Sequence, residues 1–126
     1  MPTVREIMTP LPIRISADTA LPDAARLMLH HRIRHLPITD GEGRPTALLT
    51  DMDVFARGTL TPDEHLWIGW DADAERVTAG QIASGVVLTT SPENDLGATC
   101  ARMVRHHADC ALIVEGESLI GILTEH

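Results

Sequence analysis

The apolar and polar positions along the chain alternate with two different periods. Short apolar stretches at residues 12–16, 35–39 and 46–50 have the length and composition of strands. Between the first two stretches the apolar residues recur three and four positions apart, which predicts a helix with one inward-facing stripe. The residues of this stripe are Leu21, Ala24, Ala25, Met28 and Leu29.

Turn and cap residues delimit these elements. Residues 40–43 (DGEG) join the second and third strands and are typical of a hairpin turn. Thr19 precedes the helix and is its expected N-cap, and another helix is expected to begin near Asp51. The first half of the chain therefore predicts the order strand, helix, strand, strand, helix.

The second half of the chain repeats the first. Residues 3–42, moved forward by 75 positions onto residues 78–117, meet nine identical residues. With one residue dropped the register continues, and Leu49 and Thr50 fall on Leu123 and Thr124. A repeat of this length indicates two copies of one small unit, related by a pseudo-two-fold axis. The cleft between two such copies is a common place for a ligand.

The second copy predicts the same elements as the first. Its strands are expected at residues 86–90, 110–115 and 119–124, and Asp95 is the expected cap of its helix. One copy alone would bury too little surface for independent stability, so the two copies should share a core. The inward stripe of the second helix is expected to be Leu96, Thr99, Cys100, Met103 and Val104.

Residues 54–77 separate the copies and are too apolar for a flexible linker. We expect a helix in this segment that runs back over the core. Trp67 and Trp70 are three positions apart and would share a face of that helix. Packing within the chain and packing in a subunit interface both fit this pair, because tryptophan is enriched in interfaces.

Composition narrows the range of functions. The net charge of −8 argues against a nucleic-acid binder, because affinity for nucleic acid comes largely from cations at the phosphates. No apolar run has the ~20 residues of a membrane span, and the N-terminus lacks the form of a signal peptide. Cys100 and Cys110 are the two cysteines, which favours reduced thiols and a cytoplasmic location.

The motifs of the repeat resemble those of a known family. Residues 4–10 (VREIMTP), 31–38 (HRIRHLPI) and 48–53 (LLTDMD) are similar to the motif of the CBS (cystathionine-β-synthase) domain, and residues 121–124 (GILT) keep part of it in the second copy. The resemblance implies a tandem CBS pair, also called a Bateman module. Its fold class would be α+β, with two pseudo-symmetric β-α-β-β-α units whose small mixed sheets pack with helices.

The domain boundaries follow from the repeat and this resemblance. We expect the first CBS motif at residues 1–58, a connecting segment at 59–77, and the second motif at 78–126. The second motif is expected to be short at its C-terminal end, because the printed chain ends at His126, before the position that corresponds to Asp53.

The resemblance also implies a function. Such pairs typically bind AMP, ADP, ATP or S-adenosylmethionine in the cleft between the motifs, regulate a protein partner and catalyse no reaction. The expected assembly is a homodimer, no cofactor is required, and no nucleic acid or membrane is bound. The alternative is a dimerisation or protein-interaction module that has lost ligand binding.

The resemblance implies that one site is built around Thr50 and Asp53, with a hydroxyl for a phosphate and a carboxylate for the two ribose hydroxyls. The spacing of these two residues is also that of a capping box, which stabilises a helix without any ligand. Ala47 stands where the family usually has glycine, and Asp109 would repel a phosphate. The residues expected at this first site are Leu48, Thr50, Asp53, Leu88, Ala108 and Asp109.

The resemblance implies a second site on the opposite side of the pair. This site has the better phosphate end and lacks the ribose carboxylate, so we expect at most one strong site in the chain. Its expected residues are Ile13, Ile33, Arg34, His35, Ile122 and Thr124.

Metal and catalytic sites are not expected. The adjacent pairs His30-His31 and His106-His107 would point about 100° apart on a helix, so neither pair can chelate one ion. Cys100 lies on the predicted inward stripe, where a core thiol is favoured over a nucleophile. The acidic residues show no paired-carboxylate pattern.

Overall fold

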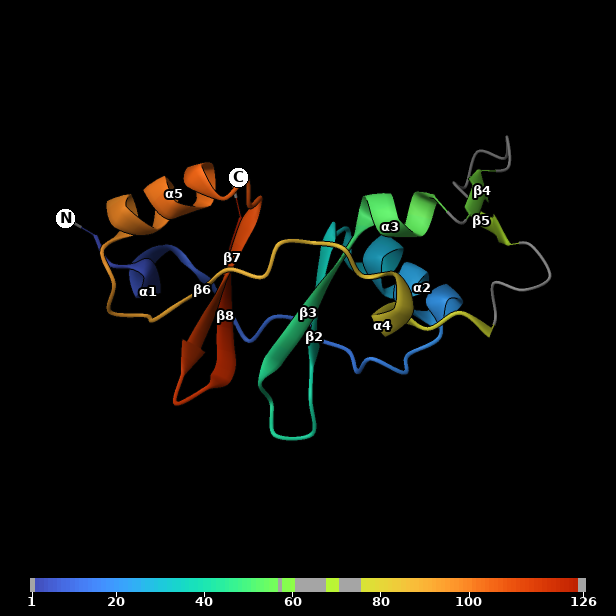
Figure 1. Cartoon of the computed structure of the whole chain (residues 1–126), viewed down its shortest axis with the longest axis horizontal. Helices are drawn as coiled ribbons and strands as arrows, with labels where there is room; N and C mark the ends of the chain where they lie inside the picture. The colour runs from blue at the N-terminus through green and yellow to red at the C-terminus, as the bar shows by residue number, and fades with distance from the viewer. Residues whose placement is uncertain (1, 57, 61–67, 71–75, 125–126) are drawn as a thin grey trace.

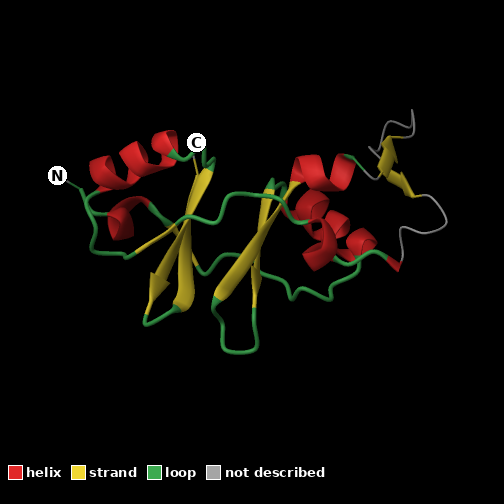
Figure 2. Ribbon diagram, viewed as in Figure 1, coloured by secondary structure: helices red, strands yellow, loops and turns green. Residues whose placement is uncertain are grey.

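The protein consists of two small sheets that face each other, with helices on the outer side of each (Figures 1 and 2). The computed structural model describes residues 2–56, 58–60, 68–70 and 76–124. We call the sheet β2-β3 with helices α2, α3 and α4 the first unit. The second unit is the sheet β1-β8-β7-β6 with helices α1 and α5. The fold is therefore α+β, with two related units.

The first unit contains the elements that the first copy predicts. Helix α2 (Leu21–His31) precedes the antiparallel strands β2 (His35–Thr39) and β3 (Pro45–Thr50), and α3 (Asp51–Phe55) begins at the expected residue. The predicted strand at 12–16 is reduced to an extended segment with one parallel bridge from Ile15 to Ile38. Hydrogen bonds from Ile15 N to Pro37 O and from Thr39 N to Ile15 O hold this segment beside β2.

The second unit has the same order of elements. Strand β6 (Thr89–Thr90) is shorter than predicted and lies parallel to β7 (Cys110–Glu115), which pairs antiparallel with β8 (Ser118–Thr124). Helix α5 (Leu96–Arg105) lies between β6 and β7 in the sequence, and the Asp95 side chain accepts a hydrogen bond from Ala98 N, as a cap should.

The short segments that begin the two copies are exchanged between the units. Helix α1 (Val4–Ile7) and strand β1 (Thr9–Pro10) pack on the second unit: β1 pairs with β8, and Val4 N donates to Asn94 O. Helix α4 (Ala79–Ile82) packs on the first unit, where Ala79 is fully buried. Figure 1 shows this exchange, with α1 beside α5 and α4 beside α2. Each structural unit therefore contains the first residues of the other sequence copy.

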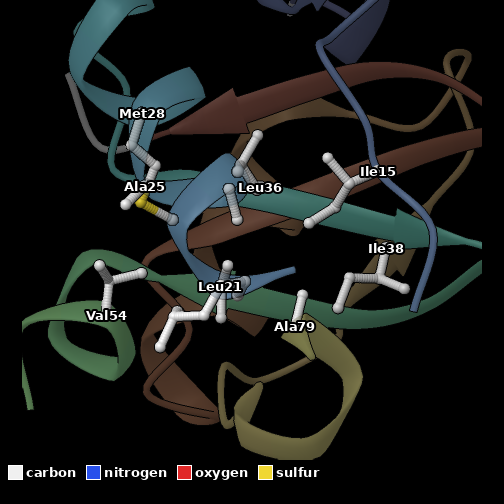
Figure 3. Packing of buried hydrophobic residues seen from close by; sticks show 10 residues of the cluster. Ile15, Leu21, Ala25, Met28, Leu36, Ile38, Val54 and Ala79 are labelled. Atoms are coloured by element: carbon white, nitrogen blue, oxygen red, sulfur yellow. The ribbon is translucent and has the colours of Figure 1, made fainter. Parts of the chain in front are cut away.

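Three apolar clusters form the core. The cluster of the first unit joins α2, β2, β3, α3 and α4, and Figure 3 shows Leu21, Met28, Val54 and Ala79 converging in it. The cluster of the second unit includes Val4, Met103 and Ile113. A third cluster joins the sheets through Leu48, Cys110, Leu112 and Leu119. The two copies thus share a core, as the size of one copy requires.

Two predictions about α2 are wrong. The N-cap is Ala20, whose φ and ψ are extended, and Thr19 makes no cap hydrogen bond because Leu21 N donates to Val77 O of the segment before α4. Pro22 in the first turn has no backbone N–H and needs no acceptor, so a side-chain cap has less to satisfy. Leu29, predicted to face inward, is 43% exposed.

The stripe predicted for α5 is also wrong in part. Thr99 and Met103 are buried, but Cys100 is exposed and Val104 is 77% exposed. The exposure differs because different surroundings lie against the two helices. Helix α3 packs against α2, whereas Cys100 and Val104 of α5 line a cavity.

The helix expected between the copies is not found in the described part of that segment. Residues Gly58–Leu60 (β4) and Ile68–Trp70 (β5) form an antiparallel pair instead. Glycine at both strands disfavours a helix, while isoleucine, threonine and tryptophan favour strands. Trp67 lies outside the described residues, and so does the side chain of Trp70, so the expected Trp pair stays a prediction.

Candidate ligand site

A cavity of about 870 Å³ lies where the two units meet. Its wall is contributed by the segment after β1, the turn before β2, the start of α3, and the ends of β7 and β8 that face this turn. All the residues expected at the second site line it, and these are Ile13, Ile33, Arg34, His35, Ile122 and Thr124.

The turn at the end of α2 places Arg32, Arg34 and His35 at the wall of this cavity. Arg32 ends the helix in the left-handed conformation, with φ 55°, and Ile33 N donates to Met28 O across the turn. The chain therefore reverses sharply, and Arg34 and His35 follow at the cavity wall. Asp51 N donates to Arg34 O at 3.0 Å, which ties the start of α3 to the same turn.

The segment after β1 supplies an apolar wall. Leu11 has a φ of 48°, which is unusual for a leucine, and its backbone N–H donates to Ile120 O. The side chain of Leu11 is 81% exposed at the cavity wall, and Pro12 and Ile13 continue that wall. A strained backbone and an exposed leucine beside a cavity are features of binding sites.

Sequence reasoning missed several residues of this cavity. Thr9, Leu11, Pro12, Arg32, Asp51 and Met52 also line it. Asp109, expected at the first site, lines this cavity as well, because the turns before β2 and β7 are related by the pseudo-two-fold and approach each other. The signal for Thr9, Leu11 and Pro12 was their position directly before the expected Ile13.

The charges around the cavity are mixed. Arg32 and Arg34 contribute two positive charges, and Asp51 and Asp109 contribute two negative charges. Thr9 and Thr124 add hydroxyl groups. The wall therefore offers both donors for an anionic group and acceptors for hydroxyl or cationic groups.

Thr50 and Asp53, the centre of the first site, are already hydrogen-bonded to protein groups. Asp53 Oδ2 accepts from Thr50 N at 2.9 Å and from Ser84 N at 3.1 Å, while the Ser84 hydroxyl donates to Oδ1. Thr50 Oγ1 accepts from Asp53 N, which completes a capping box. Partial burial raises the pKa of Asp53, but the hydrogen bonds from Ser84 and Thr50 outweigh it and lower the pKa below its usual value.

The apolar residues expected at the first site are core residues. Leu48 is buried in the cluster between the sheets, whereas Leu88 and Ala108 are buried in the cluster of the second unit. Thr50 and Asp53 line neither of the cavities described here. The structure thus brings the second set of residues to one cavity, whereas the first set is distributed between buried clusters, the hydrogen bonds of Asp53, and cavity walls at Ala108 and Asp109.

A second cavity, of about 680 Å³, lies between α5 and β8. Leu96, Cys100, Val104 and His107 line it from α5 and its end. It shares Thr9, Asp109, Ile122 and Thr124 with the first cavity. Cys100 is therefore accessible. By contrast, burial and the nearby Asp109 raise the pKa of Cys110 to about 12.

Neither metal clusters nor membrane helices occur in the described part of the chain. Among residues 2–56, 58–60, 68–70 and 76–124, no three His, Cys, Asp or Glu side chains lie close enough to hold an ion. No helix in these ranges is long and apolar enough to cross a bilayer.

Known sequences resemble this chain over one or both copies. Residues 4–58 match the CBS domain family. Chloroplastic CBS domain-containing protein CBSX2 of Arabidopsis thaliana is 43% identical over 47 residues, which are 37% of this chain and 20% of CBSX2. Homoserine O-acetyltransferase of Methanocorpusculum labreanum is 36% identical over 123 residues, which are 97% of this chain and 22% of that protein. The chain spans about a fifth of the length of these relatives.

Solved structures match the whole fold. A putative acetoin utilization protein (AcuB) of Vibrio cholerae superposes with a TM-score of 0.81 and 24% identity, over 99% of this chain and 85% of that one. The CBS domain pair of protein MJ0100, solved with 5′-methylthioadenosine and S-adenosyl-L-methionine, gives 0.76 and 21%, over 98% and 90%. CBSX2 in complex with AMP gives 0.77 and 21%, over 99% and 91%.

The family match and the fold agree with the repeat in the sequence. The matched residues 4–58 cover the first copy, and the structural matches extend over both units. Residues 4–58 belong to the CBS domain family, and the whole chain has the fold of a tandem pair of CBS domains.

Proposed function

We propose that this CBS pair is a regulatory ligand-sensing module. It binds an adenine nucleotide or another adenosyl compound in the cavity where the two units meet. The observation that carries the proposal is the convergence of Ile13, Ile33 and Ile122 with Arg34, His35 and Thr124 in one cavity. Its volume of about 870 Å³ falls within the usual range of small-molecule sites.

The wall suits the two ends of a nucleotide. An adenine ring is flat and largely apolar, and the isoleucines of the cavity wall offer it an apolar surface. The Arg34 guanidinium is suited to bidentate contact with a phosphate, and the Thr124 hydroxyl adds a further donor. In this proposal the adenine lies against the isoleucines and the phosphate lies against Arg34, His35 and Thr124.

The acidic residues decide between the candidate ligands. AMP, ADP and ATP bring increasing negative charge toward Asp51 and Asp109, whereas S-adenosylmethionine brings a sulfonium cation that these carboxylates favour. Two structural neighbours, MJ0100 and CBSX2, were solved with adenosyl compounds, which supports the class of ligand.

The module itself carries no reaction in this proposal. A ligand that binds one arrangement of the two units better shifts the population toward that arrangement, and a regulated protein partner responds to the shift. The similarity to a stretch of a homoserine O-acetyltransferase supports an enzyme as the regulated partner. We also propose that the module is a homodimer.

Thermal denaturation with AMP, ADP, ATP and S-adenosylmethionine tests the proposal. A ligand at 100 times its Kd stabilises the folded protein by about 2.7 kcal/mol, which raises the melting temperature. Absence of a shift with each of the four compounds at millimolar concentration contradicts ligand sensing.

Two arginine variants locate the site. Arg34→Ala should weaken AMP binding by roughly tenfold or more, because a charge-assisted hydrogen bond contributes about 1.5–3 kcal/mol. Arg26→Ala is the matched control, since Arg26 lies on the exposed face of α2 and pairs with Asp23 away from the cavity. Equal affinities of the two variants would place AMP elsewhere.

A protein-interaction module without a ligand is the second candidate function. The exposed apolar face of α5, with Val104 77% exposed and Cys100 exposed, favours it. Multi-angle light scattering of the protein, alone and with AMP, separates the candidates. An assembly that forms without any of the four compounds, together with no thermal shift, supports the interaction module.

A further inference from the structure

We propose that Ser84 and Asp53 form a structural clasp that closes the Thr50–Asp53 side of the pair, so that each chain binds one adenosyl ligand. The clasp consists of Thr50, Asp53 and Ser84 with the hydrogen bonds between them. The one-ligand consequence rests on the proposed function, whereas the clasp itself rests on the structure alone.

The acceptor capacity of Asp53 is largely used within the protein. A carboxylate has about four lone-pair sites, and three of them accept from Thr50 N, Ser84 N and the Ser84 hydroxyl. A ribose that offered two hydroxyls to Asp53 would have to displace at least one of these donors. Two of the three are backbone N–H groups, which then need another partner.

The backbone next to Ser84 is packed tightly against β3. Gly85 N donates to Leu48 O at 3.0 Å, so the segment is hydrogen-bonded to β3. A Cβ atom at Gly85 would lie 2.9 Å from Leu48 O and 2.8 Å from Leu48 Cδ2. A ribose that displaced Ser84 from Asp53 would therefore have to shift a segment that is held against β3.

The pseudo-symmetric position has no such clasp. Thr9 corresponds to Ser84 and Thr124 corresponds to Thr50 in the repeat. Thr9 and Thr124 both line the first cavity, the one of about 870 Å³. Neither side chain has a hydrogen bond to another described residue. On one side of the pair, Ser84 and Thr50 belong to the clasp. On the other side, the corresponding residues Thr9 and Thr124 line the cavity with their hydroxyls unbonded to described residues.

The clasp also joins the units. Asp53 is at the start of α3 in the first unit, and Ser84 lies on the segment that leads from α4 into β6 of the second unit. Ser84 is therefore a positioning residue for this segment. Its hydroxyl acts on a protein carboxylate, so its loss should change stability and leave ligand affinity unchanged.

Thermal melting of four variants tests the clasp without any ligand. Ser84→Ala and Asp53→Asn should each lower the melting temperature by roughly 3–8 °C. The double variant should melt within about 2 °C of Asp53→Asn, because residues in one hydrogen-bond network do not contribute additively. Ser84→Thr keeps the hydroxyl and should melt within about 2 °C of the unchanged protein. Additive losses, or no loss in Ser84→Ala, overturn the clasp.

Calorimetric titration with AMP tests the ligand consequence. We expect one AMP per chain, and a Kd within about threefold of the unchanged protein in Ser84→Ala and Asp53→Asn. Arg34→Ala, which should weaken AMP by tenfold or more, shows that the assay detects a site residue. Two AMP per chain, or a tenfold weaker Kd in either clasp variant, overturns the proposal. If AMP does not bind at all, the proposed function fails for AMP and the melting experiment alone decides the clasp.

Discussion

The helices α2 and α5 come from corresponding positions of the repeat but have different surroundings. Leu21 and Ala25 on α2 are 0% and 3% exposed, because Val54 of α3 packs with them. On α5, the counterpart of Leu21 is partly buried Leu96, and the counterpart of Ala25 is exposed Cys100. The same face is a core in one unit and a cavity wall in the other.

This difference shows that the elements packed against a helix decide which of its apolar residues are buried. Both helices have apolar residues at helical spacing, and both predict an inward face. Met28 and Met103, which correspond in the repeat, are both 6% exposed because each faces its own sheet. The positions that differ are those that α3 covers in the first unit.

Replacing the corresponding residues Leu21 and Leu96 with alanine should give the largest difference in stability between the two units. Leu21→Ala should lower the free energy of unfolding by about 3–5 kcal/mol, because it empties a fully buried site. Leu96→Ala should cost about 1–2 kcal/mol, since Leu96 already borders a cavity. Urea unfolding measures both, and equal losses would contradict the difference in packing.

The exchange of segments between the units predicts a steric effect at Gly85. Gly85→Ala should lower the free energy of unfolding by about 1–3 kcal/mol, because the new methyl group would lie against Leu48 O. Gly41→Ala is the matched control, since no heavy atom lies within 4 Å of its Cβ position, and it should change stability by less than about 0.5 kcal/mol. A similar loss in the two variants, by urea unfolding, would mean that the segment does not lie tightly on β3.

The lowered pKa of Asp53 predicts a pH dependence of smaller size. The folded protein holds the Asp53 pKa below its unfolded value of about 3.9, so its stabilisation is present above that pH and is lost as the pH falls through the folded pKa. The stability difference between the unchanged protein and Asp53→Asn should be about 1 kcal/mol at pH 7. It should shrink below about pH 4. Melting temperatures from pH 7 to pH 3 measure it, and a difference that does not vary with pH argues against an ionised Asp53 in the clasp.

The two thiols should differ in reactivity without any change in stability. Cys100 is exposed, whereas Cys110 is fully buried and has a pKa of about 12. A thiol reagent at pH 8 should label one cysteine of the folded protein and two after unfolding. Cys100→Ser should abolish the native labelling. Rapid labelling of both cysteines in the native state would contradict the burial of β7.

The sequence predicted most of the elements, and the residues expected at the second site all line one cavity. The residues from Ile33 to His35 lie together in the cavity with Ile122 and Thr124, because the motif resemblance located the turn before β2 and the end of β8. It did not find Asp51 or Arg32. The expected partners Leu88 and Ala108 proved to be core residues, since their apolar character serves a core as well as a ligand.

The sequence by itself determined the repeat, the order of strands and helices within each copy, and the family. These features depend on periodicity and on residues close together in the chain, which a sequence displays directly. The tertiary structure decided that α1 and α4 exchange units, that α5 keeps an exposed face, and that Asp53 meets Ser84, 31 positions away. Such contacts join distant residues and depend on which surface each segment finds available, so neither periodicity nor a motif contains them.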